Sequence, residues 1–365
     1  MSYSCAVSAE TLNFAIIGCG GITLQNHIPG LALCPGVRVT ALCDSDEAAL
    51  RRAQAQTGVV VVSRNYREIL KRDDIHAVII ATPNVFHAQI ATEAVASEKH
   101  VLCEKPLSMS FGEAMQMADA ADRAGVRHMT AFTYRFVPAM RYLTHLVQRG
   151  DAGRPYHYRS CRLQDWGTRD LGWRQTKALA GSGELGDMLS HRIDFAHLLV
   201  GKMSRLAAMV KQWHPVRGER PNDLEDWAAL LTEFETGATG VLESSKLASG
   251  RNESWRSLDS VEINGSERSF VFSTAEWNRL QTGRLGGPGL ETLEVPREFW
   301  KVPGSPRDTG NGDPLVAFRY DQAWEFVDAI RNHRPCKPDF YDGARVQAVI
   351  DAALRSAENR EWVKV

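Results

Sequence analysis

Between Leu12 and about Ala131 short, wholly apolar runs alternate with amphipathic stretches, and this alternation constrains the fold more than any other feature of the chain. The apolar runs are the predicted strands: Leu12–Ile17, Val37–Cys43, Val59–Val62, Ala77–Ala81, Val101–Cys103 and His128–Ala131. The amphipathic stretches are the predicted helices: Ile22–Leu33, Glu47–Gln56, Tyr66–Arg72, His87–Ser97 and Phe111–Ala124. Continuous apolar strands separated by helices are typical of a parallel sheet covered on both faces. The sequence therefore predicts a doubly wound α/β unit in this half.

The pattern changes after a helix-like stretch at Met140–Arg149, where Gly150, Gly153 and Pro155 mark a break. The strands predicted beyond it follow one another directly: Tyr156–Leu163, Leu206–Trp213, Trp227–Glu235, Thr239–Lys246, Leu258–Ile263 and Ser269–Phe272. Successive strands with glycine turns, expected at Thr236-Gly237 and Asn264-Gly265, favour a largely antiparallel sheet. The last part of the chain is predicted as a long excursion and two helices: Gly283–Asp313, Tyr320–Arg331 and Ala344–Asn359.

The composition places the chain among ordinary globular proteins, because 44% of the 365 residues are apolar and 24% are charged. This length predicts two domains, and a formal net charge of −1 indicates neither a nucleic-acid partner nor a membrane surface. No apolar run approaches the roughly 20 residues of a membrane span. The seven cysteines have no Cys-x-x-Cys spacing, so we expect reduced thiols: Cys5, Cys19, Cys34, Cys43, Cys103, Cys161 and Cys336. The first twenty residues lack Lys and Arg, which argues against a secretory signal, and a cytoplasmic protein is expected.

A glycine-rich turn joins the first strand to the first helix. It reads Gly18-Cys19-Gly20-Gly21-Ile22, and Thr23 occupies the position of the third glycine in the strict dinucleotide fingerprint. Gly18 suits a tight turn, Gly20 permits close approach of phosphates, and the free N–H groups of the helix start suit a pyrophosphate. The same turn could also be only a tight turn.

Asp44 supports the prediction that the glycine-rich turn binds a dinucleotide. It ends the second strand, 26 residues after Gly18, where an acid accepts hydrogen bonds from the ribose hydroxyls of NAD. An acid there repels the 2′-phosphate of NADP, so NAD is favoured, although Arg51 and Arg52 follow nearby. Asp44 could instead cap the next helix, a role that Ser45 or Asp46 fills equally well.

Two further loops follow predicted strands and point to the same edge of the sheet. The first contains Thr82, Pro83, Asn84 and His87, and both Asn84 and His87 could simply cap a helix. The second is Glu104-Lys105-Pro106. A lysine in that crevice can stabilise the alkoxide that precedes hydride loss.

A glycine-flanked segment of the second half, Gly181 to Asp194, carries a carboxylate and an imidazole at helical spacing. Asp187 and His191 stand at i and i+4, with Asp194 three residues further on. A carboxylate beside an imidazole produces a general base, so Asp187 is expected to orient His191. A metal site of these three residues is disfavoured because no second His or Cys stands at suitable spacing, and no metal is expected. An ordinary amphipathic helix is the structural alternative.

Trp166, Trp173 and Arg174 lie in a loop-like stretch just upstream. Indole faces stack on sugars and a guanidinium donates paired hydrogen bonds to hydroxyls or carboxylates, so the three residues could line a polar pocket. A core corner could equally contain two tryptophans.

These clusters occur in the order found in the glucose-fructose oxidoreductase, inositol dehydrogenase and rhizopine catabolism (Gfo/Idh/MocA) family, and the chain resembles its members over nearly its whole length. The resemblance rests on the following elements: Gly18–Ile22 with His27 and Pro29, Thr82-Pro83-Asn84 with His87, Glu104-Lys105-Pro106, Tyr134-Arg135-Phe136 with Pro138, Trp173-Arg174, Gly183–Asp194 and Asp342–Val346. Two positions depart from the family pattern, Thr23 in the fingerprint and Leu189 where a glycine is common.

The resemblance implies a Rossmann domain over residues 1–135 and an α+β domain over 136–365, whose large, open, mostly antiparallel sheet often forms a dimer or tetramer interface. Lys105, Asp187 and His191 match the family's catalytic residues. The residues expected at the cofactor are Gly18, Gly20, Gly21, Ile22, Asp44, Ser45, Thr82, Pro83, Asn84, His87, Glu104 and Lys105. Those expected at the substrate are Tyr134, Arg135, Trp166, Trp173, Arg174 and His191.

The predicted function is NAD-dependent oxidation of a secondary hydroxyl of a sugar, glycoside or polyol, or reduction of the matching keto-sugar. In this scheme Lys105 polarises the oxygen and His191 takes the proton. Two alternatives remain open. One is a redox-neutral, NAD-dependent glycoside-cleaving enzyme, and the other is a dinucleotide-sensing regulator, which would not need all three polar residues.

Overall fold

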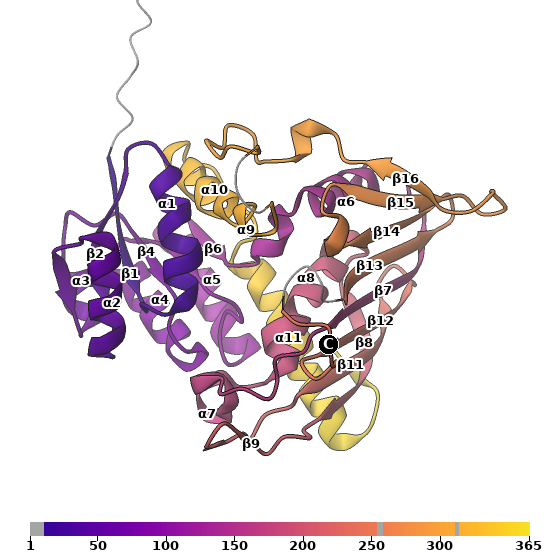
Figure 1. Ribbon diagram of the computed structural model, residues 1–365, viewed down its shortest axis with the longest axis horizontal. Coiled ribbons are helices and arrows are strands. Elements are labelled where there is room, and N and C mark those ends of the chain that lie inside the picture. Colours follow the sequence, from indigo (N-terminus) through magenta and orange to yellow (C-terminus); the bar gives the residue numbers. More distant parts are fainter. Residues whose placement is uncertain (1–10, 254–257, 311–313) are drawn as a thin grey trace, which may run out of the picture.

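The structure is a computed structural model that describes residues 11–253, 258–310 and 314–365, so Cys5 lies outside the described residues (Figure 1). Two sheets stand at opposite ends of the molecule, with helices between them. The six cysteines of the described part are free, as expected. Within the same part, no helix is long and apolar enough to span a membrane.

The first sheet has six parallel strands in the order β3-β2-β1-β4-β5-β6. Its strands are β1 (Leu12–Ile17), β2 (Val37–Cys43), β3 (Val61–Ser63), β4 (Ala77–Ile80), β5 (His100–Cys103) and β6 (His128–Thr130). Side chains of β1 alternate between two cores: Ala15 and Ile17 face one, and Phe14 and Ile16 face the other. Because both faces of the sheet are buried, its strands are apolar along their length, which confirms the predicted doubly wound parallel sheet.

Helices cover both faces of this sheet. They are α1 (Ile28–Leu33), α2 (Glu47–Thr57), α3 (Tyr66–Leu70), α4 (His87–Ala96) and α5 (Phe111–Ala124). The continuous helix predicted from Ile22 to Leu33 is wrong in detail, because a π-helical turn, η1 (Thr23–His27), precedes α1. That turn begins directly after the glycine-rich loop.

The second sheet has nine strands in the order β16-β15-β14-β13-β7-β12-β11-β8-β17. The strands are β7 (Pro155–Leu163), β8 (Met203–Lys211), β11 (Trp227–Phe234), β12 (Thr239–Ser245), β13 (Leu258–Gly265), β14 (Ser269–Ser273), β15 (Arg279–Gly283), β16 (Glu291–Glu294) and β17 (Val363–Lys364). Only the β7–β12 pair among them is parallel, which confirms a mostly antiparallel sheet. A separate two-stranded ribbon, β9 (Val216–Arg217) and β10 (Arg220–Pro221), lies outside it.

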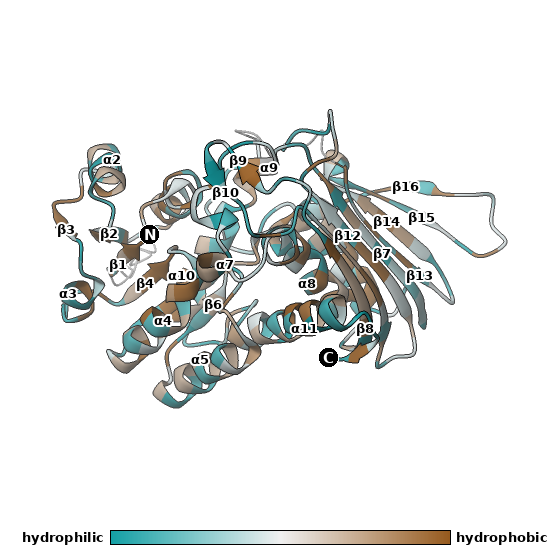
Figure 2. Cartoon of the chain, turned by 90° about the horizontal axis from the view of Figure 1, so that it is seen from below, coloured by the Kyte–Doolittle hydropathy of each residue, from teal (hydrophilic) through white to brown (hydrophobic). Residues whose placement is uncertain are grey.

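One face of the nine-stranded sheet packs against helices α8 (Ser190–Leu199) and α11 (Phe340–Asn359) (Figure 2). Helix α6 (Pro138–Gln148) belongs to the same core. Strand β11 shows the alternation that this arrangement requires, since Ala228, Leu230 and Phe234 are buried and Leu231 is half exposed. The remaining short helices are η2 (Asn84–Phe86), η3 (Thr133–Phe136), η4 (Gly172–Gln175), α7 (Lys177–Ala180), η5 (Leu185–Leu189), η6 (Thr274–Glu276), η7 (Arg297–Phe299) and α9 (Pro314–Ala317).

Three details differ from the sequence prediction. The excursion expected from Gly283 contains strand β16, whose side chains are largely exposed and show no apolar run. Gly265 still belongs to β13, and its N–H bonds to the carbonyl of Arg268, so the turn comes later than Asn264-Gly265. The third predicted strand, Val59–Val62, begins instead at Val61.

Helix α10 (Tyr320–Arg331) belongs by sequence to the second half but packs on the first sheet. Phe326 contacts Phe14 of β1 edge to face, with ring centroids 6.1 Å apart. The division into 1–135 and 136–365 stays a prediction. The packing of α10 therefore joins the last part of the chain to the core of the first sheet.

Candidate active site

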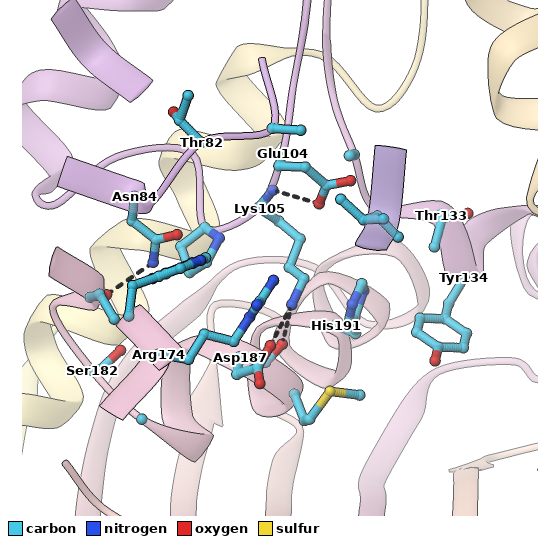
Figure 3. Close-up of a pocket in the computed structure, with 18 of the residues that line it drawn as sticks. Thr82, Asn84, Glu104, Lys105, Thr133, Tyr134, Arg174, Ser182, Asp187 and His191 are labelled. Atoms are coloured by element: carbon cyan, nitrogen blue, oxygen red, sulfur yellow. Dashed lines mark hydrogen bonds and ion pairs between the residues drawn. The ribbon is translucent and has the colours of Figure 1, made fainter. Parts of the chain in front are cut away.

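A pocket of about 190 Å³ lies where the carboxyl ends of β4 and β5 face η5 and α8 (Figure 3). Its lining from the first sheet's edge includes Ile22, Thr82, Asn84, Glu104 and Lys105. Its lining from the other side includes Thr133, Tyr134, Trp173, Arg174, Asp187, Met188, His191 and Arg319. Open α/β sheets bind ligands at this edge, so the pocket lies where the topology predicts a site.

The glycine-rich turn has the geometry that its residues predict. Gly18 has a φ of +102°, and a Cβ there would lie 2.4 Å from the carbonyl oxygen of Ala81, so glycine is required. A Cβ atom added to Gly20 or Gly21 would have no neighbouring atom within 4 Å, so a ligand can approach the backbone there. Thr23, the departure from the fingerprint, is buried and donates its hydroxyl to the Gly18 carbonyl at 2.6 Å. The Thr23 side chain therefore stabilises the turn by a hydrogen bond to its first residue.

Asp44 lies beside this turn. Its carboxylate accepts hydrogen bonds from the backbone N–H of Cys19 at 2.7 Å and of Asp46 at 2.8 Å. The helix-capping alternative for Asp44 does not hold, because Asp46 caps α2 by accepting from the N–H groups of Ala48 and Ala49. Ser45 is exposed next to it.

The Thr82–Asn84 loop presents unused polar atoms to the pocket. Thr82 Oγ1 and Asn84 Oδ1 are buried without a hydrogen-bond partner in the described part, while Asn84 Nδ2 donates to the Ala180 carbonyl at 2.8 Å. Pro83, between them, is half-buried. Buried polar atoms are normally hydrogen-bonded in folded proteins, so these two oxygens are available as acceptors for a ligand or water.

His87 is not among the residues that line the pocket, and its expected contact with the cofactor stays a prediction. It is fully buried, and its ring nitrogens lie 2.9 Å from the carbonyl oxygens of Thr82 and Pro106. Burial lowers its pKa. His87 therefore joins the two loops that follow β4 and β5.

Glu104 and Lys105 continue β5 into the pocket. Glu104 pairs with His27 at 2.9 Å; burial opposes its ionisation, yet His27 and Lys105 hold the pKa of its carboxyl below the ordinary value. The ammonium of Lys105 donates to the Asp187 carbonyl oxygen at 2.5 Å and to its carboxylate at 2.9 Å (Figure 3). Although Asp187 is buried, Lys105 and Arg174 hold its pKa well below the ordinary value, so it is a carboxylate.

His191 is 3% exposed, and its Nδ1 has no hydrogen-bond partner in the described part. Its ring meets the edge of Tyr134 at a centroid distance of 4.6 Å and that of Phe132 at 5.9 Å. Burial, and then the charges of Lys105 and Arg192, hold its pKa well below 6.5. The imidazole is therefore neutral and can accept a proton.

The expected contact between Asp187 and His191 is replaced by the Lys105–Asp187 pair. Residues Leu185–Leu189 form a π-helical turn, so the i, i+4 spacing does not place the two side chains as it does on an α-helix. Tyr134 and Phe132 orient the His191 ring instead.

The residues predicted to bind the substrate do not all line the same pocket. Trp173 lines the pocket, and the guanidinium of Arg174 stacks on it at 4.4 Å. Trp166 lines an adjoining pocket of about 490 Å³, which Tyr134 and Arg174 also line. Arg135 lines neither pocket.

Arg135 forms a buried pair with Asp194, with its Nε donating to the carboxylate at 2.7 Å, and also contacts Asp342. The structure thus places Arg135 and Asp194 in one ion pair, and the expected substrate contact of Arg135 stays a prediction. No group of three potential metal ligands occurs in residues 11–253, 258–310 and 314–365.

Four charged residues near the pockets were missed by the sequence analysis: Arg162, Glu184, Lys246 and Arg319. Arg162 had a signal, since alternation along β7 points Tyr158, Ser160 and Arg162 to the buried face. Glu184 is wholly buried; burial raises its pKa to about 7, and Lys246, 3.4 Å away, opposes that rise.

Comparison with known proteins matches both halves of the chain to family models. Residues 12–132 match the model described as oxidoreductase family, NAD-binding Rossmann fold. Residues 140–271 match the model described as the GFO/IDH/MocA C-terminal domain.

Several similar curated proteins are sugar dehydrogenases by name. Levoglucosan dehydrogenase of Pseudarthrobacter phenanthrenivorans is 32% identical, and the match covers 98% of each chain. D-xylose 1-dehydrogenase (NADP(+)) 2 of Haloferax volcanii is 31% identical, over 96% of this chain and 99% of that protein. Among solved structures, levoglucosan dehydrogenase in complex with NADH and levoglucosan superposes with a TM-score of 0.89 at 31% identity, over 98% of this chain and 100% of that one.

Proposed function

Because the chain belongs to the Gfo/Idh/MocA oxidoreductase family and has its NAD-binding Rossmann domain, we propose that it oxidises a secondary hydroxyl of a sugar, glycoside or polyol with NAD. One observation carries the proposal: Lys105, Asp187 and His191 meet in a pocket beside a glycine-rich turn at the edge of a parallel sheet. An ammonium and a neutral imidazole at one pocket are the groups that alcohol oxidation needs.

The residues at the sheet edge fit a dinucleotide. Gly20 and Gly21 leave room for a pyrophosphate, and Asp44 is fixed by the turn's own N–H with lone pairs left for ribose hydroxyls. The unpaired Thr82 Oγ1 and Asn84 Oδ1 suit the polar groups of the nicotinamide end. NAD supplies the acceptor of the hydride that leaves the carbinol carbon. The fixed carboxylate of Asp44 favours NAD over NADP.

The chain's own residues handle the oxygen and the proton. Lys105 is held by Asp187, so its ammonium is already oriented and stabilises negative charge on the substrate oxygen. His191, neutral and buried at the same pocket, accepts the hydroxyl proton. Asp187 acts by positioning Lys105, a change from the role that its spacing suggested.

A carbohydrate substrate agrees with the lining. Trp173 and Tyr134 offer ring faces to the C–H surface of a sugar, and Arg174, Trp166 and Arg319 offer hydrogen-bond donors. The relatives whose names state levoglucosan or D-xylose make these two sugars the first to test.

The test is reduced-nicotinamide absorbance with purified protein, NAD or NADP, and a panel of levoglucosan, D-xylose, other monosaccharides, glycosides, inositols and sugar acids. A steady rise with NAD and one group of substrates supports the proposal. A flat trace across the panel, with NAD binding intact, overturns it. Product chromatography with glycosides then separates redox-neutral cleavage from a dinucleotide sensor.

A further inference from the structure

Near Tyr134, at one end of the pocket, arginine side chains outnumber the carboxylates that pair with them. Arg162 and Arg192 are both buried and share a single carboxylate, Asp259, which Arg192 contacts at 2.6 Å. Their guanidinium carbons lie 5.3 and 5.5 Å from the centre of the Tyr134 ring. One carboxylate cannot neutralise two guanidinium groups, so this pair leaves a net positive charge next to the pocket.

Arg319 adds a second unbalanced charge. It lines both adjoining pockets, and its guanidinium carbon lies 5.6 Å from the same Tyr134 ring. Its terminal nitrogen donates to the Tyr134 hydroxyl at 3.3 Å, while its Nε is buried and has no hydrogen-bond partner in the described part of the chain. No carboxylate pairs with Arg319 among the residues that the structure describes.

The other unused polar atom on this side is also a donor. Trp166 lines the adjoining pocket, and its indole N–H is buried without a hydrogen-bond partner among the described residues. By contrast, two carboxylates that line the same pocket already form ion pairs: Glu253 pairs with Arg169, and Asp170 pairs with Arg220 at 2.6 Å. Arg319 and Trp166 can only donate, so the complementary ligand atom is an acceptor, and the charge excess makes an anionic acceptor the better match.

From this arrangement we infer that the substrate is an anionic sugar whose carboxylate or phosphate is bound by Arg319 and Trp166, on the side of the pocket away from the oxidised carbon. The inference rests on the proposed function and narrows its substrate class. The oxidation itself is unchanged: the carbinol C–H and O–H bonds break, the hydride goes to NAD and the proton to His191.

The electrostatics of two neighbouring groups support an anion. Burial alone raises the pKa of Tyr134, yet that pKa lies below its ordinary value because Arg162 and Arg319 outweigh burial. The same cations help to lower the pKa of His191. An anion bound at Arg319 offsets this field, so His191 becomes a stronger base only when the substrate is in place.

The experiment compares sugars matched except for charge, using NADH formation. The pairs are D-glucuronate with D-glucose and D-galacturonate with D-galactose, and D-glucose 6-phosphate separates a phosphate from a carboxylate. We expect kcat/KM for one anionic class to exceed that for the neutral partner by about tenfold or more. Equal or better turnover of the neutral sugars overturns the inference and leaves the proposed dehydrogenase intact.

Arg319→Gln tests the residue. We expect the ratio of acid to neutral kcat/KM to fall toward one, with the loss mainly in KM for the acid. The matched control is Arg279→Gln, because Arg279 is exposed and pairs with Glu294 on the β15–β16 hairpin; this variant should keep the wild-type ratio. A wild-type ratio in Arg319→Gln contradicts the inference.

A binding measurement separates failure of this inference from failure of the proposed function. Isothermal titration of the NADH-loaded protein with D-glucuronate and D-glucose requires no turnover. Tighter binding of D-glucuronate that weakens with added salt supports the anionic subsite even if no sugar is oxidised. Indifference to charge in this titration, with active turnover of neutral sugars, overturns the subsite alone.

Discussion

The ammonium of Lys105 has two contacts with Asp187, one to its backbone carbonyl oxygen and one to its carboxylate. His191 makes no such contact: burial and nearby cations hold its pKa low and its ring neutral, and it packs edge to face with the Tyr134 ring. Its Nδ1 has no hydrogen-bond partner among the described residues. We propose that the two groups have separate roles: Lys105 stabilises negative charge on the substrate oxygen and His191 accepts the proton.

At the residue scale, we propose that Asp44 favours NAD over NADP. Asp44→Asn keeps an oxygen for the Cys19 N–H but removes the charge that repels a 2′-phosphate. We expect the ratio of kcat/KM for NAD over NADP to fall by about tenfold or more. Asp46→Asn, which retains a helix-capping side chain, is the control and should keep the wild-type ratio. An unchanged ratio in Asp44→Asn would show that the acid does not select NAD.

Glu184 makes stability depend on pH. Burial raises its pKa from 4.5 to about 7, so the folded protein holds this proton where the unfolded chain releases it. The contribution is complete below pH 4.5 and is lost as pH rises through about 7. Relative to Glu184→Gln, wild-type protein should lose on the order of 2 kcal/mol of unfolding free energy between about pH 5 and 8. Urea unfolding of both proteins across this range checks it, and parallel pH curves contradict it.

At the scale of elements, α11 depends on a capping box. The Asp339 carboxylate accepts from the Asp342 N–H at 2.8 Å, and the Asp342 carboxylate accepts from the Asp339 N–H at 3.0 Å. Asp339→Ala should lower the unfolding free energy by about 1 kcal/mol, measured in urea. Glu358→Ala, an exposed position in the same helix, should change it by less than about 0.5 kcal/mol. Equal effects of the two substitutions would exclude a capping contribution.

Elements with strong local signals could be predicted from the sequence almost to the residue. The apolar runs of β1 and β2 and the periodicity of α5 and α10 have the predicted bounds. Strands β15 to β17 escaped prediction because they lie toward the sheet's edges, where side chains are exposed and few apolar residues are needed.

The sequence alone could not predict the contacts in the site between residues that are far apart in the chain. The strand end before Lys105 and the glycine-rich segment before His191 allow both residues to be assigned to one pocket from the sequence. The sequence does not show that Asp187 pairs with Lys105, 82 residues away, or that Arg135 is neutralised by Asp194. It also gives no reason to place Arg319, which precedes α10, beside Tyr134.

At the scale of the whole molecule, the second sheet leaves one face without covering helices (Figure 2). Met209, Leu231 and Val241 are exposed on neighbouring strands of that face, and Leu231 is in register with Val241. An exposed apolar surface of this kind is typical of subunit contacts, which agrees with the predicted homo-oligomer.

Leu231→Lys should therefore reduce the oligomer's mass, because it places a charge between the exposed Met209 and Val241 strands. Light scattering measures the mass, and circular dichroism checks that the variant is folded. Val60→Lys, at a residue 84% exposed on the first domain, is the matched control and should keep the wild-type mass. A wild-type protein that is monomeric, or a Leu231→Lys variant of unchanged mass, contradicts the prediction.

The central claim is that the two halves of the molecule meet to oxidise an alcohol with Lys105 and His191 as the reacting groups. The most direct test is single-turnover formation of NADH by Lys105→Met and His191→Asn, with NAD affinity measured on the same samples. The account predicts that each variant loses about 10²- to 10⁴-fold in rate while its Kd for NAD stays within about threefold of wild type. Wild-type rates, or rates that fall only in proportion to lost NAD binding, would contradict it.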